Sequence, residues 1–422
     1  MGIFNLLNTA ADFTSVAVDK IGTSGLNWIG KIVQWLIEGV GIVGLGVIVF
    51  TILLKTIVLP LDIYSRVKTK KQSLMMKKMR PQMEKLQKQY ANDKQMYSQK
   101  VMELQKQHGY SMLGACLPMI ISLVIFMVVF SAFSTYSQYA NLSTYNDMVD
   151  AYNASVQTYV RTDENPDGFL IADTDPTIEG IQYHVNYEAF ANYYPDHKAE
   201  DAAALPEDFL TRGEDESKGE NDPSPRVIVM DFVRLNARSA AAAYYKSHRT
   251  TFIWVGNIWY PDSMLNKEVP NFSKFSSAVA RAVGSGVDAS YETSYNEVTH
   301  DLGSQKKTYN GYFVLIVLAI GLMLLQQFIM MRSQKDANEL SSVDGSGAKT
   351  NKWMMIMMPI IYGIFSFFYS AAFSIYMITN TLYGLITTLI INKVMDVSFA
   401  KHADDESYWN KSKRTPKRKR LK

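Results

Sequence analysis

Lys55 is the side chain in this sequence whose position points most directly to a chemical role. It stands in the apolar run Gly39–Leu61, which carries no other charge. A lysine at the centre of a membrane-spanning helix costs about 2.5–3.5 kcal/mol, so charged residues inside spans usually mark functional sites. Lys55 precedes Asp62 by seven residues, which places it roughly 10 Å inside the expected membrane boundary. Its ammonium group either snorkels to the head groups or lies in a water-filled cavity that opens to the cytoplasm.

The predicted spans contain no acidic residue that could neutralise Lys55, so the cavity would need other polar side chains in its walls. The polar residues inside the spans are the candidates for this lining. Each of them alone is more typical of a hydrogen bond between helices than of a substrate contact. They are Thr51, Thr56, Ser122, Gln326, Gln327, Thr379, Asn380, Thr387 and Thr388.

Composition argues against several other kinds of chemistry. The chain has 422 residues, with 43 Lys and Arg against 40 Asp and Glu, and its six histidines form no HExxH motif. The single cysteine, Cys116, excludes an intrachain disulfide framework and a multi-cysteine metal site. No GxxxxGK(S/T) phosphate-binding loop is present in the sequence. We therefore expect neither an enzyme nor a protein that binds a metal, a cofactor or DNA.

Four apolar stretches are long enough to cross a bilayer, which takes about 20 residues. The last of them, Trp353–Asn392, has no charged side chain over 40 residues. As one helix it would be about 60 Å long, twice the membrane thickness, so we expect a hairpin that turns around Tyr369–Ser374. The predicted spans are 39–61, 112–136, 312–331, 353–370 and 371–392.

The charges of the connecting segments predict the orientation, because basic segments stay in the cytoplasm. Segment 62–111 carries twelve Lys and Arg against four acids, and the tail 393–422 ends in eight basic residues from Lys411 onward. Segment 137–311 is acidic, with 26 Asp and Glu against 14 Lys and Arg up to residue 308. We expect these segments outside: 1–38 and 137–311. We expect these segments in the cytoplasm: 62–111, 332–352 and 393–422.

The basic segment 62–111 has the composition of helices and predicts a hairpin. Pro81 should interrupt the first helix and start a new one, and Asn92 should cap the returning helix. The two helices would meet through matching apolar stripes. Their methionines would either hold the pair together or offer an adaptable contact surface. The stripes are Met83, Leu86 and Tyr90 on one helix and Tyr97, Val101 and Leu104 on the other.

The outer segment 137–311 is too long for a loop and predicts a small folded insert. Ser239–Lys246 is typical of a helix, and Val227–Val233 is consistent with a buried strand. Pro206–Pro225 is acidic and contains Gly and Pro, which favours a flexible stretch. Before the first span, Leu26–Ile37 is amphipathic, which is typical of a helix on the outer membrane surface or of an extension of that span.

Several motifs follow one another in an order that resembles a known family, the YidC/Oxa1/Alb3 membrane protein insertases. Together they cover about half of the chain, and their order with five spans is more specific than any one of them. The family's usual arginine is Lys55 here, which keeps the charge but loses the planar fork of donors. The motifs are KTIVLPL (Lys55–Leu61), MKKMRPQMEKLQKQY (Met76–Tyr90), PMIISLVIFMVVFSAF (Pro118–Phe133), TTFIWVGNIWYPD (Thr250–Asp262) and the closing helical hairpin (Met358–Lys393).

The resemblance implies an all-α polytopic membrane protein with five transmembrane helices around a cytoplasm-facing hydrophilic groove, a cytoplasmic helical hairpin and a large extracytoplasmic insert. It implies an insertase and chaperone of the bacterial plasma membrane. Nascent membrane proteins would enter the groove and release their hydrophobic segments into the lipid bilayer, alone or with the Sec translocon. Tyr376, the aromatic after the hairpin turn, joins the groove residues by this resemblance.

The basic tail and the hairpin would contact the ribosome, since cationic segments bind RNA through counterion release. Topology-setting charge or binding of anionic lipid is the other reading of the tail. A secondary transporter or channel with Lys55 in its pathway is the alternative function, although the chain shows no paired repeat. A receptor or anchor would leave Lys55 without a role. The tail residues are Lys411, Lys413, Arg414, Lys417, Arg418, Lys419, Arg420 and Lys422.

Overall fold

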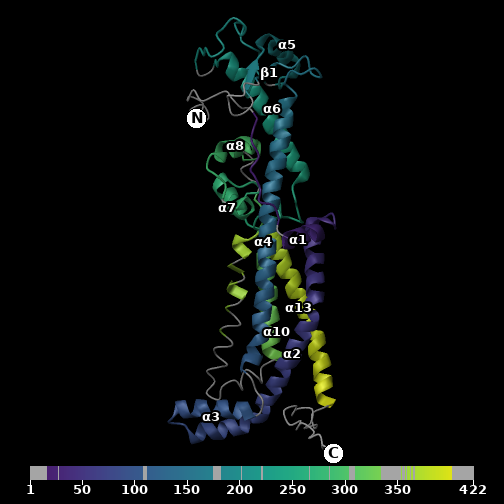
Figure 1. Cartoon of the computed structure of the whole chain (residues 1–422), viewed down its shortest axis with the longest axis vertical. Coiled ribbons are helices and arrows are strands. Elements are labelled where there is room, and N and C mark those ends of the chain that lie inside the picture. The colour runs from purple at the N-terminus through teal and green to yellow at the C-terminus, as the bar shows by residue number, and fades with distance from the viewer. Residues whose placement is uncertain are drawn as a thin grey trace, which may run out of the picture. The chain divides into compact units, whose positions relative to one another are not determined.

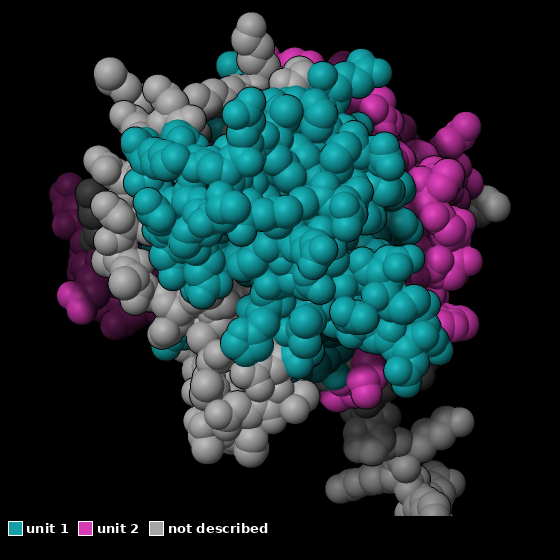
Figure 2. Space-filling view, turned by 90° about the horizontal axis from the view of Figure 1, so that it is seen from above, with its two compact units in different colours: residues 1–26, 137–250, 267–309 teal, residues 27–136, 251–266, 310–422 magenta. Residues whose placement is uncertain are grey.

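The structure is a computed structural model with two compact units, coloured separately in Figure 2. Unit 1 comprises 1–26, 137–250 and 267–309, and unit 2 comprises 27–136, 251–266 and 310–422. The structure describes residues 17–26, 28–107, 112–173, 182–200, 202–219, 222–265, 267–284, 286–303, 309–333, 353, 357, 359–361, 363–364 and 366–401.

Unit 2 is built from long helices (Figure 1). They are α1 (Trp28–Glu38), α2 (Val43–Gln89), α3 (Lys94–Gln107), the first part of α4 (Met112–Gln157), α10 (Val314–Ser333) and α13 (Ala371–Lys401). α13 packs against both α2 and α10. α4 is one helix whose residues up to Tyr136 belong to unit 2 and whose residues from Ser137 belong to unit 1.

Among the described residues, three helices of unit 2 are long and apolar enough to cross a membrane, and they lie at the first, third and fifth predicted positions. They are Val43–Lys68, Val314–Arg332 and Ala371–Ser398. The second predicted span begins in α4, where the side chains of 112–123 lie outside the described residues. Much of the fourth also lies outside them, around the shorter apolar helix Pro359–Phe368. The turn before the last span is at Tyr369 and Ser370, as predicted.

α2 continues from the membrane span into the hairpin as one helix, so the prediction that Pro81 starts a new helix is wrong. A proline removes one backbone hydrogen bond and usually kinks a helix. Here Met79 and Met83, on either side of Pro81, are buried against Val101 and Leu104 of α3, which stabilises the helix across the proline.

Asp93 caps α3, and this corrects the assignment of that role to Asn92. Its Oδ1 accepts hydrogen bonds from the backbone N–H groups of Gln95 and Met96, at 3.1 and 2.9 Å. A carboxylate in this position satisfies amides that have no partner within the helix and also favours the positive end of the helix dipole.

The helix expected over Leu26–Ile37 is present as α1. It buries Val33 and Ile37 and exposes Trp28 and Trp35. Gly46 of α2 allows α1 to approach closely, because a Cβ at this position would lie 2.2 Å from the carbonyl oxygen of Ile37.

The loop 251–266 holds the first turns of two spanning helices. The buried carboxylate of Asp262 accepts hydrogen bonds from the backbone N–H groups of Tyr312 and Leu315, both at 2.7 Å, at the start of α10. The carbonyl oxygens of Tyr260 and Ile258 accept from Ala371 and Ala372 of α13, at 2.8 and 2.9 Å. One loop therefore fixes both helix starts.

Unit 1 is a small α+β fold that confirms the prediction of a folded insert. Its strands β1 (Leu170–Asp173) and β2 (Gln182–Val185) pair antiparallel, with Leu170 opposite Val185. Its core is rich in aromatic rings, such as Phe169 against Phe190 at a centroid distance of 5.0 Å. Its helices besides the end of α4 are α5 (Tyr187–His197), α6 (Pro225–His248), α7 (Phe272–Val283), α8 (Tyr291–Val298) and α9 (His300–Gly303).

Two predictions for unit 1 are corrected, and one is confirmed, within 206–248. Val227–Val233 is helical, not a strand, because it lies in α6, where Ser224 caps the helix and Pro225 occupies its first turn. The apolar residues of this stretch include Val229 and Val233, four apart, which lie on one buried helix face. Ser239–Lys246 is helical, as predicted.

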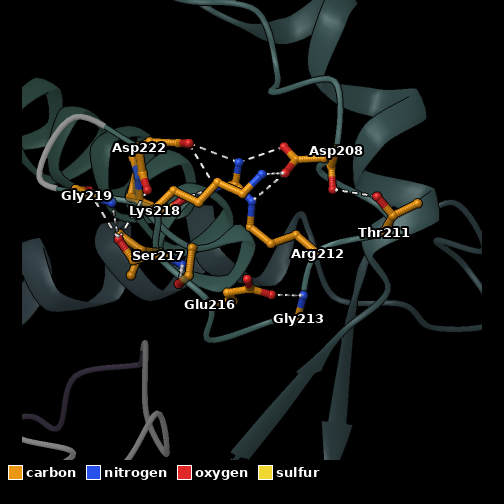
Figure 3. Close-up of polar contacts among 12 residues, drawn as sticks. Asp208, Thr211, Arg212, Gly213, Glu216, Ser217, Lys218, Gly219 and Asp222 are labelled. Carbon is orange, nitrogen blue, oxygen red and sulfur yellow. Dashed lines mark hydrogen bonds and ion pairs between the residues drawn. The ribbon is translucent and has the colours of Figure 1, made fainter.

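The stretch Pro206–Pro225 is not simply flexible, because its described residues form a network of ion pairs (Figure 3). The Arg212 side chain is only 3% exposed and pairs with Asp208 at 2.6 Å and Asp222 at 2.7 Å. Lys218 pairs with the other oxygen of Asp208. Hydrogen bonds from Arg212 and Lys218 hold the pKa of Asp208 well below its usual value.

Candidate functional site

A cavity of about 190 Å³ lies among the helices of unit 2. α2, α4, α10 and α13 contribute its walls, together with Pro359. Half of its lining is polar. The polar lining residues are Lys55, Asp62, Gln326, Gln327, Tyr376, Asn380 and Thr381, and the apolar ones are Leu54, Val58, Ile125, Phe126, Met323, Pro359 and Met377.

Five of the eleven predicted groove residues line this cavity: Lys55, Gln326, Gln327, Tyr376 and Asn380. They come from three helices that are far apart in the sequence. The structure therefore brings together Lys55 and three amides chosen for their polarity within apolar runs, along with Tyr376, which the resemblance implied.

Five predicted threonines donate to a carbonyl oxygen of their own helix instead: Thr51, Thr56, Thr379, Thr387 and Thr388. Thr51 is buried and donates to the carbonyl oxygen of Val47 at 2.6 Å, and Thr387 donates to that of Tyr383 at 2.9 Å. Thr56 donates to the carbonyl of Ile52 at 2.8 Å, and its hydroxyl lies 3.3 Å from the Tyr383 hydroxyl. The alternative, a hydrogen bond between helices, is found for Thr56 with Tyr383 of α13 and for Thr388, whose hydroxyl accepts from Arg66 of α2 at 2.7 Å. The side chain of Ser122 lies outside the described residues.

Lys55 is half-buried in the cavity wall. It makes no hydrogen bond and no ion pair within 4.0 Å to any other residue that the structure describes. Gln327 has a buried side-chain oxygen that likewise lacks a partner among the described residues. Buried polar groups need partners, and the cavity has room for several water molecules, since each needs about 15 Å³ of such volume. Both groups therefore favour a hydrated cavity.

Asp62 is a cavity residue that the sequence analysis missed. By length and composition, the part of α2 that could cross a membrane runs from Val43 to Lys68 and includes Asp62, whereas the predicted span ends at Leu61. The predicted span ends at Leu61 because Asp62 is the first acidic residue after it. Its spacing of seven from Lys55 was the available signal, since two turns of a helix bring both residues to one face.

Arg66 follows Asp62 by one helical turn and connects α2 with α13. Its Nη2 lies 3.6 Å from the Asp62 carboxylate, and its Nη1 donates to the Thr388 hydroxyl at 2.7 Å. One turn further on, Lys70 pairs with Asp396 of α13 at 2.9 Å. The two helices are thus joined by polar contacts beyond the Asp62 end of the cavity.

Aromatic rings pack at the opposite end of the cavity, and we call them the aromatic cluster. Phe130 contacts Tyr369 and Phe373 at centroid distances of 4.5 and 5.4 Å, and Phe133 contacts Tyr376 at 5.8 Å. Tyr376 also lines the cavity, so the cluster reaches its wall. The cavity therefore has an aromatic end and a charged end. The cluster comprises Phe50, Phe126, Phe130, Phe133, Tyr369, Phe373 and Tyr376.

The hairpin buries some of its methionines and exposes others. Met79 and Met83 hold α2 against α3, whereas Met96 and Met102 are exposed. The basic tail residues Lys411–Lys422 lie outside the described residues.

Comparison with known proteins places these features in a family. The sequence profile of the 60Kd inner membrane protein family matches residues 35–165 and 246–398. The chain belongs to the 60Kd inner membrane protein family. Its matched residues include all those that line the cavity, whereas 166–245 of unit 1 lie outside the match. The resemblance to the YidC/Oxa1 insertases is confirmed at the level of the family.

Relatives of this family member are similar to it over parts of their length. A Fusobacterium nucleatum protein named membrane protein insertase YidC is 44% identical over 91 residues, which are 22% of this chain and 42% of the relative. One from Caldanaerobacter subterraneus is 30% identical over 116 residues, 28% of this chain and 54% of the relative. One from Haemophilus influenzae is 34% identical over 137 residues, which are 31% of this chain and 23% of the relative. The chain thus spans about half or less of these relatives, which bear the same name. No solved structure matches the chain.

Proposed function

We propose that this protein is a membrane protein insertase. It accepts the polar outer segment of a nascent membrane protein in the cavity of unit 2 and releases the adjoining hydrophobic segment into the bilayer. The observation that carries the proposal is the position of Lys55 in a polar cavity between apolar spanning helices. The names of the curated relatives support it.

Lys55 would attract acidic residues of the entering segment. A charge that crosses the apolar core of a bilayer must lose its hydration, which is the main barrier to translocation. Water, amide groups and Lys55 in the cavity would replace part of that hydration. The distance that a charged residue must cross without hydration would then be limited to the level of the aromatic cluster.

The hydrophobic segment would leave along the lipid-facing surfaces of the same helices. α2, α10 and α13 expose large apolar side chains such as Ile57, Phe328 and Ile386. Apolar segments leave water spontaneously, because burial yields about 25 cal/mol per Å² of apolar surface. The partition of this segment into lipid would thus drive the transfer, and no bond is made or broken.

The orientation, the partners and the depth of the cavity belong to this proposal. The charged end, with Asp62 and Arg66, would face the cytoplasm, and unit 1 would lie outside. The hairpin and the tail would contact the ribosome, and the Sec translocon would be a partner for some substrates. Anionic head groups would also attract the tail, at about 1 kcal/mol per basic residue near the surface.

Crosslinking of nascent chains tests the proposal. A photoreactive residue at position 55 should capture ribosome-bound membrane proteins through their outer segments. Lys55→Arg should retain insertion, whereas Lys55→Ala should lower it several-fold for substrates with acidic outer segments. Substrates with neutral outer segments are the control and should change less. Capture of small solutes only would favour a transporter or channel, and equal insertion by all three forms would contradict the role of Lys55.

A further inference from the structure

Asp62 and Lys55 give the cavity two opposite charges. Both side chains line the same cavity, and they belong to the same face of α2. Their Cα atoms are separated by about two helical turns, or roughly 10 Å along the axis. A site that only attracted acidic segments would not need a carboxylate in its wall, so Asp62 calls for an explanation of its own.

The contacts of Asp62 keep it at the charged end of the cavity. Arg66 lies 3.6 Å from its carboxylate and is anchored to Thr388 of α13 by the hydrogen bond of Nη1 at 2.7 Å. The Nε of Arg66 is buried and has no hydrogen-bond partner among the described residues. The 3.6 Å contact leaves the oxygens of Asp62 able to bind a further donor, because it is too long to be a hydrogen bond.

The order of the charges along α2 decides what an entering segment meets. A segment that came from the Asp62 end would pass the carboxylate before it reached Lys55. Asp62 would repel an acidic side chain and attract a basic one, because unit charges interact over this range even where water partly fills the site. Asp62 would also offset the field of Lys55 throughout the cavity.

We propose that Asp62 determines the charge selectivity of the insertase, by weakening the retention of acidic outer segments and by binding basic ones. This inference rests on the proposed function, because it concerns the substrate class of the same cavity. Lys55 and Asp62 together make the cavity a site for segments of either charge, and neither residue alone does so.

The alternative is that Asp62 only stabilises the contact between α2 and α13. Its partner Arg66 also donates to Thr388 of α13 and so joins the two helices. The chain offers a matched control in Asp396, which pairs with Lys70 at 2.9 Å between the same helices and does not line the cavity. Asp396→Asn removes a carboxylate from the contact between α2 and α13. It leaves the charges of the cavity unchanged.

Disulfide crosslinking of two matched substrates measures the selectivity. The full chain carries Cys116→Ser and Met377→Cys, which places one thiol in the cavity wall. The substrates are ribosome-bound membrane proteins with one cysteine in the outer segment, identical except for two aspartates in one and two lysines in the other. The measured quantity is the ratio of the crosslink yield with the acidic substrate to that with the basic one.

Asp62→Asn should raise this ratio by about five-fold, as expected for the loss of one charge at this range. Asp62→Glu and Asp396→Asn should leave it within two-fold of the parent. An unchanged ratio in Asp62→Asn, or an equal rise in Asp396→Asn, would overturn the selectivity role while crosslinking itself continued. Absence of any crosslink from the parent with either substrate would instead overturn the proposed function, and this inference with it.

Discussion

At the scale of single residues, short hydroxyl side chains and charged ones behave differently in the spanning helices. Thr51 and Thr387 satisfy their hydroxyls with carbonyl oxygens one turn back in their own helices, so they need no water and no partner. Lys55 has no such option, because its ammonium group stands at the end of a long chain. The ammonium group of Lys55 therefore depends on the cavity for its hydration, whereas the threonine hydroxyls find their hydrogen-bond partners within their own helices.

Thr51→Val should leave insertion within two-fold of the parent, since the only hydrogen bond lost is internal to α2. The change in stability should stay below about 1 kcal/mol, because a hydroxyl bonded to its own helix adds little net free energy. Insertion assays with the acidic substrates and thermal unfolding in detergent measure the two effects. A loss of insertion as large as that of Lys55→Ala would place Thr51 in the site after all.

In unit 1, Glu297 makes stability depend on pH. Burial alone would raise its pKa, but hydrogen bonds from Arg238, at 2.6 and 2.8 Å, and the charge of that residue leave it below the usual value. A carboxyl with a lowered pKa in the folded state contributes stability above its unfolded pKa of about 4.3, and this stability is lost as the pH falls through the folded pKa. Asp208 acts in the same direction.

We predict that unit 1 opens more readily as the pH is lowered from 6 to 3, and that Glu297→Gln flattens this dependence while it destabilises the unit at neutral pH. Asp231, whose pKa is raised by burial, should act oppositely, so Asp231→Asn should stabilise unit 1 at pH 7. Hydrogen exchange of α6 in the full chain, corrected for the intrinsic rate at each pH, measures this. A pH profile of Glu297→Gln identical to that of the parent would refute the assignment.

At the scale of elements, the loop 251–266 positions two spans through their first turns. Asp262 supplies two short hydrogen bonds to α10, and Gly311 makes this possible, since a Cβ there would lie 1.8 Å from the Asp262 Oδ1. The starts of α10 and α13 are thus linked through one loop rather than through helix packing alone. These two helices carry Gln326 and Asn380, which both line the cavity.

Asp262→Ala and Gly311→Ala should each lower the stability of the full chain by about 1–2 kcal/mol, because both remove the cap of α10. Asp93→Ala removes the exposed cap of α3 in the hairpin and should cost less. Thermal unfolding in detergent with a tryptophan fluorescence readout would compare the three. If Gly311→Ala unfolded at the parent's temperature, the close approach to Asp262 would not matter for stability.

At the scale of the whole molecule, membrane spans were easier to predict than the folded insert. Lys55 stood out because a charge within an apolar run is rare, and Gln326 and Asn380 because amides there are rare. Asp62 was missed because the apolar run was ended at the first acidic residue, although the helix continues to Gln89. Pro81 misled because proline ends most helices, whereas methionine packing against α3 keeps α2 intact.

The fold of the insert depends on tertiary contacts that no local sequence pattern predicts. Tyr145 of α4 packs on Tyr295 of α8 at 5.3 Å, and Phe169 packs on Phe232 at 6.4 Å. Val227–Val233 has the β-branched composition of a strand, but packing places it in α6. Propensity is a weak prior where tertiary contacts decide.

The hydration of the cavity is the central claim, and thiol labelling tests it most directly. Asn380→Cys places a thiol in the cavity, and Leu382→Cys places one on the exposed apolar face of α13 two residues away. Both variants keep Lys55 and carry Cys116→Ser. Thiols react as thiolates, which form in water and not in lipid. We predict that N-ethylmaleimide labels position 380 at least about ten-fold faster than position 382 in intact membranes, and that a ribosome-bound substrate slows the reaction at 380. Equal, slow labelling at both positions would mean a dry cavity and would contradict the account.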